Sequence, residues 1–403
     1  MGNQFMKDET PAGRMIAPTT DPPEAAVAVL PINELPIRQT KRVVTMGGHL
    51  LHSEQMADST ALRSNDSPNL SPQGSPTKGA PPIGMPSALT GKDLRQKNLR
   101  LANLRRLDLR KSDFRDADLY SANLQEADLR YSNFSNAEMQ EADLSLSNLS
   151  NAQLIGTHLN FALLYTANLS SANLNQVSMT HADLREADFH EANLQRANLS
   201  DSNLSYSDCG RCDLSFAKLI HVNFREAVLR HAKGCGVNLR LANLFRVDLS
   251  KADLSDADLM GANLQSASLY EACLVNAHLV GANLVRASFY SADLTQANLS
   301  KVNAESTTFS RAILKRATLV SAKLRAANFY SVDMSQVNLQ YADLTSAILC
   351  DSNLEGADLR NTILQGVNLR GANLRGADLR KADLTDVNLA DAHIEGAKFS
   401  HSS

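Results

Sequence analysis

The sequence predicts an all-β fold in which residues 87–403 coil into a solenoid, preceded by a disordered arm over residues 1–86. From Leu94 to Phe399 every fifth residue is a central, mostly apolar position, and 47 of these 62 positions are leucine. A small residue stands two places before most central positions, and in 40 cases it is alanine. All 12 prolines lie at or before Pro86, so two different kinds of chain are joined near that residue.

The arm is rich in proline, serine and threonine, a composition that cannot bury enough apolar surface to fold alone. Ser67, Ser71 and Ser75 each precede a proline, which makes proline-directed phosphorylation one hypothesis. A secretion signal and a plain linker are the alternatives. Two apolar stretches, residues 25–30 and 43–51, are candidates for a short segment that caps the first coil.

The five-residue period excludes an amphipathic helix and favours short extended segments. In a helix, leucines five residues apart would point about 140° apart and form no apolar stripe. In an extended chain the small residue and the leucine, two places apart, point to the same side. The polar pair that follows turns the backbone, so the next unit also faces inward. Asp or Asn fills most of the intervening positions, where we expect it to stabilise the turn rather than to bind calcium.

These units resemble the pentapeptide-repeat family, whose pattern is Ala-Asp/Asn-Leu followed by two variable residues. Runs such as EADLR, SANLQ and GANLR carry the resemblance, which covers about three quarters of the chain. It implies a right-handed quadrilateral parallel β-helix with four units in each coil. On that expectation residues 87–403 form about 15 coils and a rod of roughly 75 Å at the strand spacing of β-sheets.

With four units per coil, residues 20 apart should stack in columns along the rod. One outward column then reads Tyr270, Tyr290, Ser310 and Tyr330. Exposed aromatic side chains in a row are enriched at protein interfaces, so the three tyrosines are candidate partner-binding residues. The alternative is that tyrosine simply suits a strand surface. The central column directly inside this one contains Phe289, Phe309 and Phe329, which are expected to fill the core.

Basic residues gather at both ends of the predicted rod. Nine Lys or Arg against five Asp lie between Lys92 and Asp118. Near the other end Arg360 and Arg380 share a column, and they are further candidate partner-binding residues. Such clusters suit a phosphate backbone, an acidic lipid surface or an acidic protein. The preferred interpretation is a solvated face that discourages end-to-end stacking of open coils.

Cys209 and Cys212, together with His231 and Cys235, have a spacing that suggests a zinc site. The repeat register argues against zinc, because it places the first two side chains inside the rod and the other two outside, on a different coil. We therefore expect no metal site and interpret the thiols as small core fillers.

Three central positions are occupied by residues too small to fill the interior. They are Cys209, Gly234, with Gly236 close by, and Ala304. Glycine within a strand often marks a bulge or a bend. The sequence therefore predicts a local kink at the two glycines and a second flaw at Ala304.

Composition narrows the classes of function. The chain has 40 basic and 43 acidic side chains, so nucleic acid is not an expected partner. Five scattered cysteines favour a reducing, cytoplasmic location, and no apolar run is long enough to span a bilayer. Histidines are isolated, and no phosphate-binding loop or base-activated nucleophile is evident. We expect no catalytic residues, no enzyme activity and no cofactor.

The leading hypothesis is a non-catalytic scaffold whose rigid rod binds a protein partner of unknown identity. A second hypothesis is a translocated bacterial effector that is secreted and binds a host protein or membrane. A third follows from the resemblance, because some pentapeptide-repeat proteins modulate DNA gyrase by imitating duplex DNA. Those mimics are acidic and dimerise through a C-terminal helix, and neither feature is evident here. An open solenoid end also leaves a homodimer as an alternative.

Overall fold

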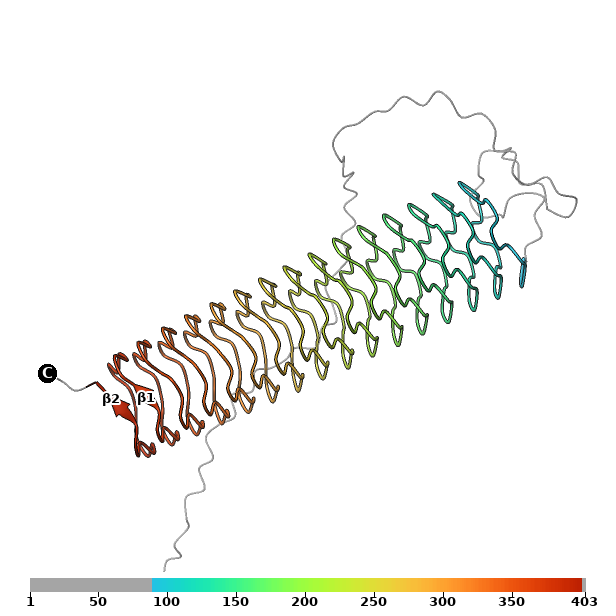
Figure 1. The fold of residues 1–403 in the computed structure, drawn as a ribbon. Coiled ribbons are helices and arrows are strands. Elements are labelled where there is room, and N and C mark those ends of the chain that lie inside the picture. Colours follow the sequence, from blue (N-terminus) through green and yellow to red (C-terminus); the bar gives the residue numbers. More distant parts are fainter. Residues whose placement is uncertain (1–88, 401–403) are drawn as a thin grey trace, which may run out of the picture. The chain divides into compact units, whose positions relative to one another are not determined.

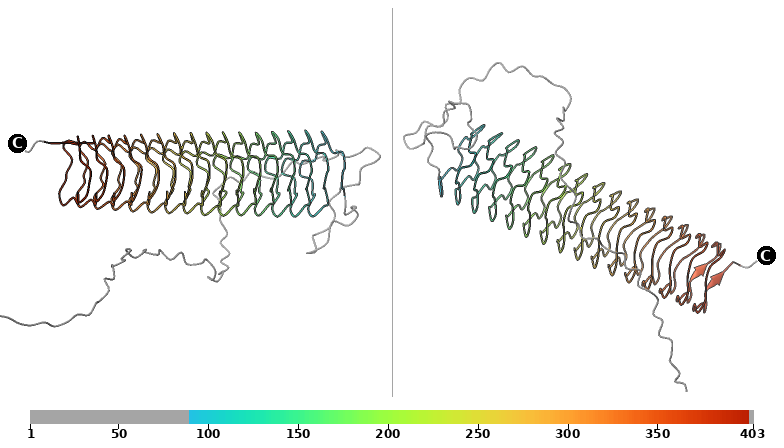
Figure 2. Two further views of the ribbon diagram at one scale, coloured as in Figure 1. Left: turned by 90° about the horizontal axis from the view of Figure 1, so that it is seen from below. Right: turned by 180° about the vertical axis from the view of Figure 1, so that it is seen from behind.

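The computed structural model describes residues 89–400, which wind into one continuous stack of coils (Figure 1). The arm predicted over residues 1–86, with its three Ser-Pro sites and two apolar stretches, lies outside the described residues. Neighbouring coils run side by side along the whole stack, as Figure 2 shows from two further directions. The described part of the chain contains no helix that could cross a membrane.

Each coil contains 20 residues, because every extended segment pairs in parallel with the segment 20 positions further along the chain. The pairing begins with Asp93 opposite Asp113 and continues as isolated bridges along the stack. At its end it widens into two short parallel strands, β1 (Asp378–Leu379) and β2 (Lys398–Phe399). The described residues thus form a parallel β-helix with four five-residue units per coil.

Two sets of backbone hydrogen bonds hold each unit in place. Between coils, the N–H of Leu119 donates to the carbonyl of Glu138 at 2.7 Å, and the N–H of Asp118 donates to the carbonyl of Lys97 at 2.9 Å. Between consecutive units, the N–H of Ala122 donates to the carbonyl of Leu119 at 2.9 Å and closes a four-residue turn. The same pattern repeats along the stack, so backbone polar groups between coils are satisfied without a conventional sheet.

The third residue of this turn has a positive φ in every unit, as a type II turn requires. Only ten of these residues are glycine, and the others include bulky ones such as Tyr131 with a φ of 61°. Left-handed backbone costs a non-glycine residue about 1–2 kcal/mol, so the turn needs support. The Asx side chain supplies it: Asn123 Oδ1 accepts the N–H of Gln125 at 3.1 Å. The predicted turn-stabilising role of Asp and Asn is confirmed.

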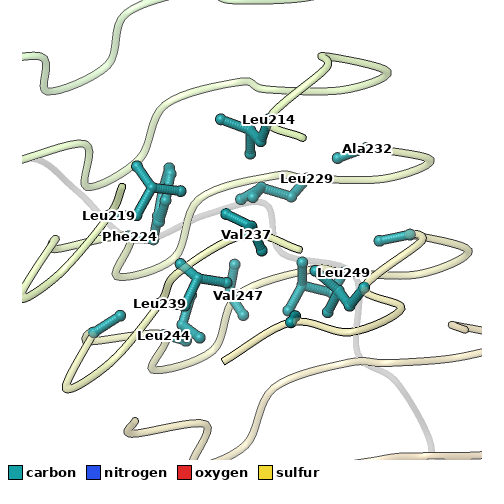
Figure 3. Packing of buried hydrophobic residues seen from close by; sticks show 14 of the residues in the cluster. Leu214, Leu219, Phe224, Leu229, Ala232, Val237, Leu239, Leu244, Val247 and Leu249 are labelled. Atoms are coloured by element: carbon teal, nitrogen blue, oxygen red, sulfur yellow. The ribbon is translucent and has the colours of Figure 1, made fainter. Parts of the chain in front are cut away.

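Side chains at the central and small positions fill the interior of the coils. Figure 3 shows Leu219, Phe224 and Leu229 among the side chains that pack there. Nearly all central residues are fully buried, from the second described coil to the last but one. The phenylalanines of one column stack as predicted, with ring centroids 5.1 Å apart for Phe289 and Phe309. Burial of each such side chain favours folding by about 1.5–3 kcal/mol.

The kink predicted at Gly234 and Gly236 and the flaw predicted at Ala304 are wrong. The N–H of Gly234 donates to the carbonyl of Asp253 at 2.6 Å, and Gly236 has the positive φ of its counterparts in other units. Ala304 is buried, and its N–H is hydrogen-bonded to the next coil. The coil continues because its backbone bonds do not depend on the size of the central side chain, and Leu254 leans into the space beside Gly234.

Candidate functional site

Three tyrosines occupy the predicted outward column, and we call Tyr270, Tyr290 and Tyr330 the tyrosine stripe. The rings of Tyr270 and Tyr290 stack across adjacent coils, with centroids 5.8 Å apart and planes 7° from parallel. Tyr330 is exposed two coils further along. Ser310 stands between Tyr290 and Tyr330 and is only 7% exposed, so the aromatic surface is interrupted there.

Charged side chains flank the tyrosine stripe. The Arg311 guanidinium lies 5.7 Å from the centroid of the Tyr290 ring, within the range of a cation–π contact. A hydrogen bond to Glu271 raises the pKa of the Tyr270 hydroxyl. Lys251 in turn lies 3.4 Å from that carboxylate. The stripe therefore combines apolar ring surface with charged groups of both signs at its edge.

Arg360 and Arg380 share a column as predicted, but each guanidinium is already paired within its own unit. Arg360 Nη2 lies 2.6 Å from Asp358 Oδ2, and Arg380 Nη2 lies 2.6 Å from Asp378 Oδ2. Asp378 also lies 3.8 Å from Arg360 Nε, so the four side chains form an alternating ladder. These pairs leave less net positive charge for a partner than the sequence suggests.

The basic cluster at the other end is compensated in the same way. Each of its arginines has a carboxylate within 4 Å on its own coil or the next. Within this cluster only the three lysines, Lys92, Lys97 and Lys111, have no ion pair with a described residue. This arrangement favours the interpretation of a solvated face. The paired arginines are Arg95, Arg100, Arg105, Arg106, Arg110 and Arg115.

The ion pairs of Glu126 with Arg105 and Arg106 allow a testable prediction about pH. Hydrogen bonds from Arg106 and Arg105 lower the pKa of Glu126 from 4.5 to about 2. A carboxyl pKa that is lower in the folded chain contributes stability above the unfolded value, and this stability is lost as the pH falls through the folded value. The pairs are solvent-exposed, so the effect on unfolding should be small. An NMR titration of the Glu126 carboxyl should show a midpoint near 2.

The double substitution Arg105→Gln with Arg106→Gln is the control for this titration. It removes both hydrogen-bond donors, so the Glu126 midpoint should return towards 4.5. Equal midpoints in the two proteins would show that the arginines do not hold the carboxylate.

The four side chains considered as zinc ligands do not gather at one place. Cys209 and Cys212 are buried in the interior, whereas Cys235 is half-buried and His231 is exposed. A hydrogen bond with Cys209, together with burial, raises the pKa of the Cys212 thiol, which disfavours the thiolate that zinc needs. No group of three or more potential metal-ligating side chains occurs within residues 89–400.

One surface feature was missed by the sequence reasoning. Phe161, at the end of one unit, and Leu163 and Tyr165, on the next unit, are all exposed, and Leu146 is exposed beside them on the preceding coil. We call these four residues the apolar row. The signal was present in the sequence, because Leu163 stands where most units have Asp or Asn.

Comparison with protein families identifies the repeat over almost the whole described chain. The family model described as Pentapeptide repeats (8 copies) matches eleven segments between residues 88 and 401, and those from residue 207 onward overlap. No curated protein matches the full sequence significantly. The matched segments are 88–119, 122–160, 167–205, 207–244, 242–279, 274–303, 292–329, 305–340, 327–366, 338–376 and 363–401.

Several solved structures are similar. HetL, a pentapeptide repeat protein involved in heterocyst differentiation regulation in the cyanobacterium Nostoc sp. strain PCC 7120, is 33% identical. The match covers 56% of this chain and 92% of HetL, with a TM-score of 0.30. A thylakoid-lumen pentapeptide repeat protein from Arabidopsis thaliana is 38% identical, covering 22% and 63% of the two chains, with a TM-score of 0.22.

QnrB1, a plasmid-mediated fluoroquinolone resistance protein, is 17% identical. The match covers 55% of this chain and 91% of QnrB1, with a TM-score of 0.32. All three TM-scores are low, so the sequence match over the repeats carries the assignment.

Proposed function

Because this chain belongs to the pentapeptide-repeat family, we propose that its solenoid is a non-catalytic scaffold that binds a protein partner through its side walls. The observation that supports this most is the fixed spacing of the surface columns. Every unit between the first and last described coils is hydrogen-bonded to the coils before and after it, so outward side chains are held in register without a large ordering cost at binding. A rigid surface of this kind suits recognition better than chemistry.

The hollow at the first coil contains no catalytic arrangement of side chains, which favours binding over catalysis. It has a volume of about 480 Å³ and lies where Arg95 pairs with Asp93 and Arg115 pairs with the adjacent Asp113. Its lining offers no nucleophile with an activating base. The residues that line it are Asp93, Arg95, Gln96, Lys97, Arg115 and Asp116.

The proposal extends to the geometry of the coils and to the location. We infer a right-handed coil with four sides, which the family pattern implies and the four units per coil support. All five cysteines are free, which supports a reducing cytoplasm as the place of action. The compensated charge of both ends argues against imitation of DNA, which needs an acidic rod.

The tyrosine stripe is the first surface to test. We expect the triple substitution Tyr270→Ser, Tyr290→Ser and Tyr330→Ser to remove at least one protein captured from native lysate by the wild-type chain. Loss of three aromatic contacts at an interface commonly costs more than 2 kcal/mol, which is over tenfold in affinity.

Three exposed tyrosines outside the stripe provide a matched control. Substituting Tyr131, Tyr206 and Tyr341 with serine removes the same number of rings from other columns. Captured proteins should be retained by this control. Identical sets from wild type and the stripe variant would refute the stripe as a binding surface.

A further inference from the structure

The apolar row forms a compact surface on a different part of the solenoid from the tyrosine stripe. Phe161 and Leu163 are 56% and 44% exposed, and Tyr165, two residues further along the chain, is 37% exposed. Leu146 lies directly beside Tyr165, because its N–H donates to the Tyr165 carbonyl at 2.9 Å. Single exposed apolar residues are ordinary on a protein surface, but four adjacent ones indicate an interaction site.

Leu163 breaks the local rule that stabilises the turn. Its partners on the neighbouring coils are Asp143 and Asp183. Each of these carboxylates accepts the backbone N–H two residues later, at 3.0 Å from Ser145 and 3.3 Å from Arg185. Leucine has no oxygen for this bond, so the unit loses its turn support and exposes an apolar side chain instead. Such a departure from local consistency is expected at functional positions.

Carboxylates without a cationic partner surround the apolar row. Asp143 adjoins Leu163, Glu141 precedes Phe161 in its column, and Glu186 lies 3.3 Å from the Tyr165 hydroxyl. Within the described chain none of these three carboxylates has a salt bridge, whereas Asp113, Asp358 and Asp378 near the ends of the solenoid are paired with arginine. The negative charge of Glu186 also raises the pKa of Tyr165. The Arg185 guanidinium also lies 5.4 Å from the centroid of the Tyr165 ring, but it is paired with Asp183 at 2.6 Å. His181 stacks on Phe161 with ring centroids 4.9 Å apart. The surface is thus apolar at its centre, and carboxylates outnumber cationic groups at its rim.

Backbone pairing with a ligand is excluded on this face, because the coils use those groups. The N–H groups of Phe161 and Leu163 donate to neighbouring coils at 2.9 Å, and the Tyr165 carbonyl accepts from Leu146. Recognition must therefore use side chains, with apolar contacts at the centre and positive charge at the edge.

We propose that the apolar row binds a short cationic amphipathic segment of a partner protein. The apolar side chains of the segment cover Phe161, Leu163 and Tyr165, and its Lys or Arg side chains pair with the surrounding carboxylates. The proposal rests on the role of the solenoid as a binding scaffold but uses its own surface. The proposal specifies the kind of partner, a cationic amphipathic segment, whereas the tyrosine stripe does not.

The test uses the full chain and a short fluorescent peptide of alternating lysine and leucine. Fluorescence anisotropy should show saturable binding that weakens as salt is added, because the rim charges are exposed. Leu163→Asn should weaken this binding by about tenfold or more, since it removes the central apolar contact. The variant should fold, because asparagine restores the usual residue at this position and the missing turn bond.

Ile313→Asn is the matched control. Ile313 also occupies the Asx position, lies between two aspartates, Asp293 and Asp333, and is 41% exposed. Its neighbours along the unit are Arg311 and Lys315 instead of aromatic residues. The control should bind the peptide as tightly as the wild type does.

Three outcomes would overturn the proposal. The first is equal affinity of the wild type and Leu163→Asn for the peptide, or no binding by either. The second is equally tight binding of a peptide of alternating glutamate and leucine. The third is self-association of the wild type, seen by sedimentation and lost in Leu163→Asn, which would identify a second copy as the occupant.

The tyrosine-stripe variant separates this proposal from the scaffold proposal. It should bind the lysine–leucine peptide normally, and a loss of binding there would place the peptide on the stripe and overturn the apolar row. Failure of the peptide test would leave the capture experiment with the stripe unaffected.

Discussion

Replacing Phe309 with alanine is expected to lower the free energy of unfolding by about 3–5 kcal/mol. Phe309 is fully buried, and its ring stacks between Phe289 at 5.1 Å and Phe329 at 4.9 Å. The interior cannot collapse into the space left by the ring, because backbone bonds to neighbouring coils fix the wall. For example, the N–H of Phe309 donates to the backbone carbonyl of Asn328 on the next coil at 2.7 Å. A cavity should therefore remain.

Urea denaturation measures the total loss, and amide hydrogen exchange measures where it occurs. In a repeat protein each coil is stabilised mainly by its neighbours, so exchange should accelerate first in the coils around Phe309. Phe216→Ala is the control, because that ring is 60% exposed and its removal should change stability by no more than about 0.5 kcal/mol. Equal effects of the two substitutions would contradict a packed interior at Phe309.

The interior could be predicted because it depends only on the five-residue spacing of the central residues. A residue every five positions defines the inward side, and four units per coil define which residues stack. Phe309 could thus be placed in an aromatic stack from the sequence. The same rule overestimated the importance of a missing side chain at Gly234, because side-chain periodicity does not describe backbone hydrogen bonding.

Surface electrostatics was less predictable, because counting charges ignores the direction of side chains. Arg360 and Asp358 are two residues apart on an extended segment, so both side chains point to the same side and pair. The short run DLR carries this information, yet a count of basic residues treats Arg360 as free. The positive φ of residues such as Tyr131 was also not foreseen, because few residues other than glycine adopt it without support.

The apolar row shows a third limit. The column rule relates residues 20 apart along the rod, whereas Phe161, Leu163 and Tyr165 lie across it on two consecutive units. Alternation of exposed apolar residues over five positions was visible in the sequence. The five-residue rule does not reveal this alternation, because the central leucine pattern continues unbroken through Leu164.

The substitution Ala292→Leu is expected to destabilise the solenoid by about 1–3 kcal/mol or more, although it adds apolar surface. Ala292 is fully buried in a column with Ala272 and Ala312, which are buried on either side. Its N–H also donates to the Phe289 carbonyl at 3.0 Å, so its backbone cannot retreat to make room. The larger side chain must then force neighbours out of their preferred rotamers.

Ala292→Ser tests whether size or polarity limits this position. Buried serines already occupy small positions elsewhere, where the hydroxyl donates to the carbonyl three residues earlier: Ser147 Oγ lies 2.6 Å from Leu144 O, and Ser352 Oγ lies 2.7 Å from Leu349 O. The buried hydroxyl is therefore satisfied, and serine should cost less than leucine. Urea unfolding of the two variants measures the difference. A more stable leucine variant would mean that the interior has unfilled room and that alanine is not required there by packing.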